Sequence, residues 1–195
     1  MKKKTGILLV IALAFMSYGC AAKEETTATT IEIKKDGTLT HYIVEEFKGE
    51  NYNETELLEM VESEISDYNL TDGTEKIKLT EMSVEESIAK PILSFEDFSC
   101  YAAFNDVDFF YGTVAQAYEA GYDLSISLNH VEDGTTISRD DILKMGQYYI
   151  VIMEENCNVK LFKKIEYTSS NVIVKDKKEA TVQTQDGELA YLLFQ

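Results

Sequence analysis

The chain has 195 residues and a mass of 22.1 kDa, and its 45% hydrophobic content with a single Pro excludes a collagen-like or low-complexity protein. One apolar run alone approaches spanning length, which excludes a multi-span membrane protein. The 18 basic residues stand against 35 acidic ones, and the formal charge of -17 argues against nucleic acid as a partner.

The N-terminus has the three-part pattern of a secretory signal peptide. Three lysines at positions 2–4 precede an unbroken apolar run from Ile7 to Met16, and small residues follow it. The basic end stays in the cytoplasm by the positive-inside effect, while the apolar run enters the bilayer. This pattern predicts that the residues after it are exported.

The segment Ser17-Tyr18-Gly19-Cys20 resembles the lipobox of bacterial lipoproteins in its Gly-Cys pair, although that class usually has Leu where Ser17 stands. The resemblance implies cleavage between Gly19 and Cys20 and a diacylglyceryl group, of the kind labelled by palmitate, on the Cys20 sulfur. Two acyl chains would anchor the protein stably, at ~0.8 kcal/mol per buried CH₂. We therefore expect a lipid anchor on the extracytoplasmic face of the cell membrane.

Two alternatives stay open for this segment. Residues 6–22 just reach the lower length limit for an uncleaved membrane anchor. Ordinary signal peptidase could also cut near Ala21. A buried core helix is disfavoured, because the run has no amphipathic period.

We expect three parts: residues 1–19 as a lipoprotein signal peptide, 20–30 as the lipidated Cys with a polar tether, and 31–195 as one extracytoplasmic domain. The tether lacks apolar periodicity, and ten such residues reach at most ~35 Å. Removing the leader takes three lysines, so the mature chain has 15 basic against 35 acidic residues and a formal charge of -20. The domain should then be repelled by an anionic membrane surface, with the lipid alone holding it there.

The first elements of the domain carry clear local signals. Asp36-Gly37 between Thr30–Lys34 and Leu39–Glu46 predicts a hairpin with a tight turn. Asn53 followed by Glu56 predicts a helix start. That helix should run to about Tyr68 and pack through one apolar face, namely Leu57, Leu58, Val61, Ile65 and Tyr68.

The remaining elements alternate irregularly. Predicted strands are Lys76–Val84, Ser87–Phe95 (at an edge or bulge, because of Pro91), Leu124–Leu128, Tyr148–Met153, Val159–Thr168, Val172–Lys175, Glu179–Gln183 and Leu189–Phe194. Predicted helices are short: Glu96–Asn105 as helix or loop, Thr113–Gly121, and Ser138 to about Gly146. This order predicts an α+β fold, mainly an antiparallel sheet with a few short helices in a single domain, and excludes a doubly wound nucleotide-binding fold.

Aromatic residues are the most distinctive feature of the domain. Phe95, Phe98, Tyr101 and Phe104 recur at a spacing of three, which is typical of core packing along a helix. A partner-binding surface is the alternative, with candidate residues Phe104, Phe109, Phe110 and Tyr111. The stretches 97–105 and 112–114 also resemble lipoproteins of low-GC Gram-positive anaerobes without assigned activity, which supports the compartment and adds no site.

Signals for catalysis or metal binding are weak. His41 and His130 stand apart from any ligand cluster, and no motif for zinc, a phosphate loop or a serine nucleophile is present. Asp106 and Asp108 could bind calcium but more simply form a turn. Cys100 and Cys157 could pair as a disulfide or stay as thiols. We predict no catalytic residue, no metal and no cofactor.

The sequence thus favours a non-catalytic, lipid-anchored binding or cell-envelope module. Its partners would be the membrane, through Cys20, and an envelope protein or a small ligand. The alternatives are an envelope-facing hydrolase with two carboxylates across a cleft, or a small accessory receptor of a transporter. The lack of a nucleophile–base pattern favours binding over catalysis.

Overall fold

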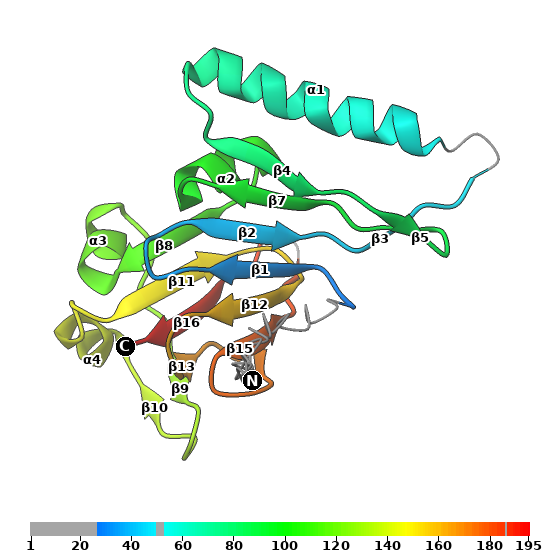
Figure 1. Cartoon of the computed structure of the whole chain (residues 1–195). Helices are drawn as coiled ribbons and strands as arrows, with labels where there is room; N and C mark the ends of the chain where they lie inside the picture. Colours follow the sequence, from blue (N-terminus) through cyan, green and yellow to red (C-terminus); the bar gives the residue numbers. More distant parts are fainter. Residues whose placement is uncertain (1–26, 50–52, 186) are drawn as a thin grey trace, which may run out of the picture.

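The computed structural model describes residues 27–49, 53–185 and 187–195, and its strands form three sheets (Figure 1). The pairing between strands is antiparallel throughout the described residues except for one parallel pair, β1 with β12. The predicted α+β character, with mainly antiparallel sheets and a few helices, is therefore confirmed. The signal peptide, Gly19, Cys20 and most of the predicted tether lie outside the described residues.

The large sheet contains seven strands, in the order β14 (Val172–Val174), β15 (Glu179–Val182), β12 (Asn158–Leu161), β1 (Thr30–Ile33), β2 (Leu39–Tyr42), β7 (Ile92–Phe95) and β4 (Ile77–Glu81). The predicted hairpin is β1–β2, and its turn places Gly37 at a φ of +90°, where a side chain would be strained. The Asp36 carboxylate accepts hydrogen bonds from the Thr38 N–H at 3.1 Å and hydroxyl at 2.7 Å. Strand β4 forms one edge of this sheet.

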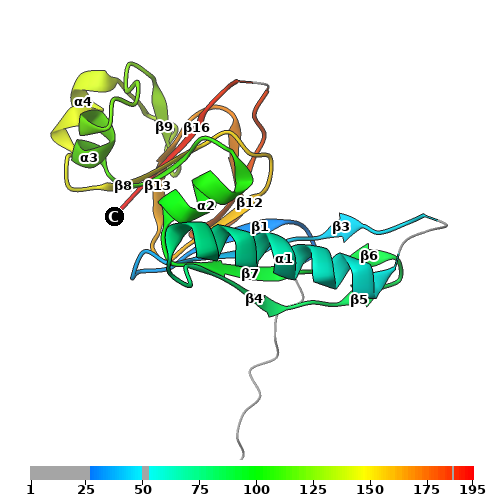
Figure 2. The same ribbon diagram turned by 90° about the horizontal axis from the view of Figure 1, so that it is seen from above.

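The second sheet contains six strands, in the order β10 (Thr136–Ile137), β9 (Leu128–His130), β13 (Ile165–Thr168), β16 (Ala190–Phe194), β11 (Tyr149–Met153) and β8 (Phe109–Thr113). A small sheet contains β3 (Glu45–Glu46), β6 (Ile88–Ala89) and β5 (Val84–Glu85). It lies beyond one end of the large sheet, beside the N-terminal half of α1 in both views (Figures 1 and 2).

Several predicted strands differ from the observed ones. Lys76–Val84 is divided between β4 and β5, Leu39–Glu46 is divided between β2 and β3, and β8 was not predicted. The predicted strand Val159–Thr168 is two strands, because the chain leaves the large sheet after β12 and joins the second sheet at β13. The predicted strand Ser87–Phe95 is broken at Pro91, which separates β6 from β7 and cannot donate to a ladder. In the predicted strand Leu124–Leu128, pairing begins only at Leu128.

The four described helices begin near their predicted positions and are α1 (Glu54–Asp72), α2 (Phe98–Asn105), α3 (Val114–Glu119) and α4 (Arg139–Lys144). Asn53 caps α1 by accepting from the Thr55 N–H at 2.9 Å. The helix ends at Asp72, four residues later than predicted, and the Gly73 cap that follows has a φ of +77°. At the start of α3, Thr113 and Gln116 form a capping box.

Two apolar layers hold the sheets together. Alternate residues of β11 divide between them: Val151 and Met153 face the large sheet, and Ile150 and Ile152 face the α3 and α4 side. Strand β16 divides in the same way, with Leu192 in the first layer. Because both faces of the second sheet are buried, its central strands read as almost continuous apolar runs.

Helix α1 covers the β7–β4 side of the large sheet (Figures 1 and 2). Ile65 is 8% exposed and joins the core, and Val61 and Tyr68 pack against it while remaining half-buried. The predicted packing residues Leu57 and Leu58 are also half-buried. The amphipathic face is thus narrower than the sequence pattern indicates, and a groove opens beside it.

Candidate functional site

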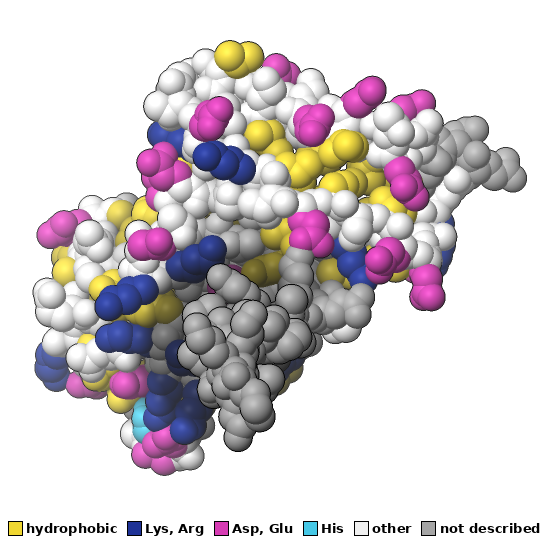
Figure 3. Space-filling view, in the orientation of Figure 1, with side chains coloured by type: hydrophobic (Ala, Val, Ile, Leu, Met, Phe, Trp, Pro, Cys, Tyr) yellow, Lys and Arg dark blue, Asp and Glu magenta, His cyan; other side chains and the backbone are white. Residues whose placement is uncertain are grey.

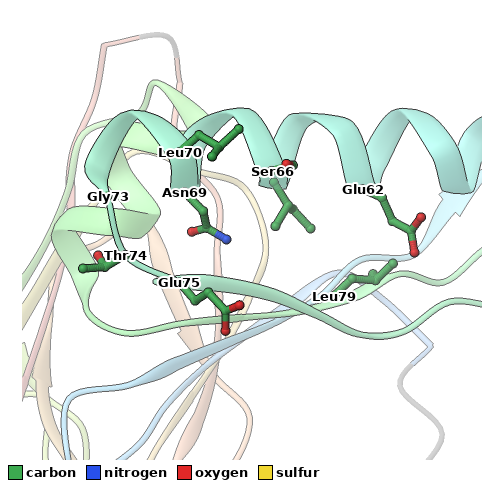
Figure 4. A pocket seen from close by; sticks show the side chains of 9 residues that line it. Glu62, Ser66, Asn69, Leu70, Gly73, Thr74, Glu75 and Leu79 are labelled. Carbon is green, nitrogen blue, oxygen red and sulfur yellow. The ribbon is translucent and has the colours of Figure 1, made fainter.

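The groove runs between the C-terminal half of α1 and strand β4 (Figure 4). Its volume is about 580 Å³. It is lined by Glu62, Ile65, Ser66, Asn69, Leu70, Gly73, Thr74, Glu75 and Leu79. The walls therefore come from two elements and the turn between them, which the Gly73 cap and Asn69 hold in place.

Asn69 closes one end of the groove by bonding to the edge of β4. Its Nδ2 donates to the Ile77 carbonyl at 2.8 Å, and its Oδ1 accepts from the Ile77 N–H at 3.1 Å. Oδ1 also accepts from the Lys76 N–H at 3.0 Å. The carboxamide thus acts as a short piece of neighbouring strand and satisfies the outward-facing backbone groups of Ile77.

The next outward-facing backbone groups of β4 belong to Leu79. Lys76 bonds inward, since its carbonyl accepts from the Glu96 N–H at 2.9 Å, whereas Ile77 bonds outward to Asn69. In an antiparallel pair this direction alternates along the strand, so Leu79, like Ile77, directs its N–H and C=O away from β7. A bulge follows between Leu79 and Glu81 and ends the regular edge. No strand in the described part of the chain pairs with this side of β4, so Leu79 presents a free strand edge within the groove.

The side chains of the groove combine an apolar floor with acidic margins. Ile65 and Leu79 pack against the core, while Leu70 is 76% exposed. Glu62 projects from α1, and Glu75 projects from the turn before β4 (Figure 4). Figure 3 shows the same arrangement on the surface, with apolar side chains exposed beneath α1 and acidic side chains around them. Such a surface can bind an apolar group that carries positive charge nearby.

A second polar cluster is buried between the sheets. The Tyr101 hydroxyl lies 2.9 Å from both carboxylate oxygens of Glu155, and the Tyr101 ring packs edge-on against His41, with centroids 5.3 Å apart. Burial raises the pKa of Tyr101, and the charge of Glu155 raises it further. Burial also raises the pKa of Glu155 itself. The Tyr101–Glu155 pair is therefore a structural hydrogen bond within the core.

His41 and Cys157 are held in their neutral forms in this region. Burial lowers the pKa of His41 to about 4, and its Nδ1 has no hydrogen-bond partner among the described residues. Burial and the neighbouring Glu155 raise the pKa of Cys157 to about 12. Near neutral pH there is thus neither a thiolate nor an imidazolium, and the cluster lacks the activated pair that nucleophilic catalysis requires.

The candidate partner-binding aromatics are distributed over both apolar layers. Phe109 is 2% exposed and packs on Tyr101 at 4.9 Å, and half-buried Phe104 packs near Tyr68 at 5.8 Å. Tyr111 stacks on Tyr149 at 5.9 Å. These side chains do not form one exposed patch, because neighbouring residues of a strand point to opposite faces.

Phe110 points away from Phe109, toward the α3 side of the second sheet. It is 6% exposed, and its ring lies 5.2 Å from that of Phe98 and 5.0 Å from that of Tyr122. These three rings, with Asp108, border a smaller hollow of about 380 Å³. The edge-to-face and tilted geometry of the rings is typical of stable aromatic packing.

The other candidates have structural contacts. Cys100 and Cys157 are free, buried thiols, so the disulfide alternative is not formed. Asp106 ends α2 at a φ of +54°, as the turn interpretation expects. His130 contacts Asp133 through Nδ1 at 2.7 Å and lies on the Tyr167 ring. Within the described ranges no three His, Cys, Asp or Glu side chains converge as metal ligands.

The residues that build the groove were not singled out by sequence reasoning. Nothing in the local sequence indicated that Asn69 bonds to a strand edge or that Leu79 lies on one. No helix in the described part of the chain is both long and apolar enough to cross a bilayer. Comparison with known protein families, curated proteins and solved structures finds no match to this chain.

Proposed function

We propose that the protein is a lipid-anchored, extracytoplasmic binding module, folded as one unit, whose α1–β4 groove holds an extended peptide segment. The observation that carries this proposal is the free edge of β4 at Leu79, which lies inside the groove. An exposed strand edge with an adjacent apolar floor is the arrangement that peptides use when they add a strand to a sheet. Catalysis has no part in this proposal.

Backbone pairing would supply the basic affinity. A peptide strand beside β4 could exchange hydrogen bonds with the N–H and C=O of Leu79. The preceding outward-facing position, at Ile77, is already filled by the Asn69 carboxamide. Asn69 would then mark where the added strand must stop. The register of the peptide would be limited by this block on one side and by the bulge after Leu79 on the other.

The side chains of the groove favour a particular peptide composition. Ile65, Leu70 and Leu79 would take apolar side chains, since alternate residues of a strand face the same side. Glu62 and Glu75 would attract a Lys or Arg at the margin. Because both carboxylates are exposed, each would contribute less than about 1 kcal/mol to the free energy of binding. They would favour a basic peptide, while backbone pairing supplies the basic affinity.

The lipid anchor is supported by the N-terminal sequence. Gly19-Cys20 follows an apolar run with a basic start, and polar residues separate it from β1. The test replaces Cys20 with Ser in the full chain and labels cells with palmitate. Loss of both the label and membrane retention is expected. If both survive the change, an uncleaved membrane anchor replaces the lipid in the proposal.

The hydrolase alternative has less support. The two acidic side chains of the groove are both exposed, and Glu75 lies 3.6 Å from Lys78. A general acid requires a carboxyl group whose burial keeps it protonated near neutral pH, and neither position provides that burial. An accessory role beside a transporter would be one way of using the same groove.

The binding test uses a peptide of alternating valine and lysine, titrated into the full chain by isothermal calorimetry. A copy that is N-methylated on alternate residues keeps the side chains but removes the donors that pair with β4. We expect the methylated peptide to bind at least tenfold more weakly, which corresponds to about 1.4 kcal/mol. Equal affinity for the two peptides would contradict strand addition.

Matched charge variants locate the site. The double change Glu62→Gln, Glu75→Gln should weaken the lysine peptide about fivefold, since two exposed pairs are lost. The control, Glu59→Gln with Glu64→Gln, changes the net charge equally on exposed residues of α1 that do not line the groove. If both variants weaken binding to the same degree, only the overall charge matters and the groove is not the site.

A further inference from the structure

The lysines are concentrated at one end of the large sheet. Eight of the thirteen described lysines belong to three short segments, 34–36, 160–164 and 175–179. They are Lys34, Lys35, Lys160, Lys163, Lys164, Lys175, Lys177 and Lys178. The same segments hold three acidic residues, so this region, called here the lysine end, is basic in a chain whose formal charge is -17.

The topology of the large sheet brings these three segments together. The last pair of the parallel strands β1 and β12 is Ile33 beside Leu161, so the chain continues from both strands at the same end. The Leu161 N–H donates to the Lys178 carbonyl at 2.8 Å, and the Ile165 N–H donates to the Lys177 carbonyl at 2.8 Å. The β1–β2 turn, the β12–β13 link and the β14–β15 hairpin are therefore neighbours.

Five of these side chains are available to a partner. Lys34, Lys35, Lys163, Lys177 and Lys178 are exposed and form no salt bridge with any described residue. The two acidic turn residues beside them are already engaged by their own turns. Asp36 accepts from Thr38, as described above, and Asp176 accepts from the N–H groups of Lys178 at 2.7 Å and Glu179 at 2.9 Å.

The remaining three lysines of the region are held by neighbours. Lys160 lies 3.4 Å from Glu179, Lys164 pairs with Glu132, and Lys175 donates to the Asn158 side chain at 2.8 Å. They add positive charge behind the five free side chains.

Acidic residues predominate at the other edge of the sheet. Among its described side chains, helix α1, beside β4, carries six exposed carboxylates: Glu54, Glu56, Glu59, Glu62, Glu64 and Asp67. Figure 3 shows acidic side chains around α1 and lysines gathered over the lower part of the same face. Five strand positions separate β15 from β4, which is about 24 Å at the usual strand spacing. The molecule thus has a basic region and an acidic region well apart from each other.

We propose that the lysine end docks on the phosphate headgroups of the anionic bilayer that carries the lipid anchor, with the acidic α1 edge of the sheet farther from that surface. This inference rests on the anchoring part of the proposed function. Strand β1 spans only about 10 Å from Thr30 to Ile33, and the ten residue steps from Cys20 to Thr30 can reach ~35 Å. The tether is therefore long enough for the lysine end to contact the headgroups.

The charge distribution changes what the net charge alone predicted. A formal charge of -20 on the mature chain predicts simple repulsion from an anionic surface. Because screening limits these interactions to about 8–10 Å in physiological salt, the surface responds to the nearest charges and not to the total. The lysine end is then attracted while the acidic α1 side is repelled, and both effects favour the same orientation.

A bilayer fits the lysine end better than a single bound phosphate does. The lysines lie on three separate loops, and each ammonium is a point charge on a flexible stem that can meet a fluid array of phosphates. A single phosphate is held more often by the planar fork of Arg. The one Arg of the chain, Arg139, lies in α4 and not at the lysine end.

The test measures amine reactivity residue by residue. The full lipid-bearing chain is reconstituted on vesicles of phosphatidylcholine, or of phosphatidylcholine mixed with phosphatidylglycerol, and treated with a water-soluble acylating reagent. Mass spectrometry then gives the extent of modification of each lysine. We expect Lys34, Lys163, Lys177 and Lys178 to react at least threefold more slowly on the anionic vesicles, and salt to remove the difference. Lys48 and Lys144, which lie elsewhere, are internal controls.

Separate outcomes distinguish the two proposals. If the chain fails to co-sediment with neutral vesicles, the proposed lipid anchor is wrong. Docking is then tested by mixing the chain with anionic vesicles and measuring the same lysine reactivities. If the chain co-sediments but the four lysines react equally on both vesicles, docking is wrong. Equal slowing of Lys48 and Lys144 would also overturn it. A third sample contains the chain with soluble polyphosphate. If polyphosphate slows the modification of the four lysines and anionic vesicles do not, the lysine end binds a phosphate polymer and not the bilayer.

Discussion

Burial of His41 makes the stability of the protein depend on pH in a calculable way. The native pKa is about 4 because of burial, whereas the ordinary value is 6.5. Between these two pH values the unfolded chain binds a proton at His41 and the native protein does not. Stability is therefore full above pH 6.5 and falls as the pH drops toward 4. The expected loss from this residue is about 2 kcal/mol at pH 5 and about 3 kcal/mol below pH 4.

The change His41→Phe removes the titrating group and keeps a ring against Tyr101. Urea unfolding at pH 8 and pH 5, followed by circular dichroism, measures the free energy of unfolding of both proteins. We expect the wild type to lose about 2 kcal/mol more than the variant between these pH values. Glu155, whose raised pKa acts in the opposite direction, is present in both proteins and cancels in the comparison.

Two further variants test whether His41 causes this difference in pH dependence. His41→Leu repeats the test in case the larger Phe ring strains the core, because only the pH dependence and not the absolute stability is compared. His130→Ala is the matched control, and it should lose as much stability as the wild type. If the wild type and both His41 variants lose stability in parallel, His41 is not held neutral by burial and the reasoning is refuted.

Three other outcomes are expected. Ile65→Asp should lower the free energy of unfolding by about 3 kcal/mol or more in urea titrations, because a charge would be buried without a partner. The control Glu64→Asp, on the exposed face of α1, should change this free energy little. Cys157, with a pKa of about 12, should resist iodoacetamide at pH 8 until urea unfolds the chain, so fast alkylation of the native protein would contradict its burial. A chain that begins at Thr27 should unfold in one cooperative transition, and a spectrum without secondary structure would disprove folding as one unit.

The elements that the sequence predicted well depend on contacts between near neighbours. The Asn53 cap and the Thr113–Gln116 capping box each form within three residues, and the Asp36-Gly37 turn within four. Their interactions do not depend on the rest of the fold, so the local residue pattern is sufficient. The break at Pro91 follows from its missing donor, whereas the sequence pattern predicted one strand with Pro91 at an edge or bulge.

The candidate site could not be predicted in the same way. Leu79 is important because β4 has no neighbouring strand on one side among the described residues, and the order of strands in a sheet is a property of all its strands together. Asn69 reads as an ordinary residue before a turn until Ile77 lies beside it. The aromatic spacing correctly indicated packing around Tyr101, but it did not separate Phe109 in one layer from Phe110 in the other.

By itself the sequence determined the helices, the caps and turns, most of the strands, the mainly antiparallel class and the acidic excess, because hydrogen bonds, periodicity and charge are carried by short stretches of chain. The tertiary structure decided which distant segments meet. The parallel pairing of β1 with β12 gathers the lysines of three loops at one end of the sheet, and the position of β4 leaves a strand edge beside α1. Such pairings depend on the burial of both apolar layers at once, since the entropy of closing long loops is repaid only when the whole core forms.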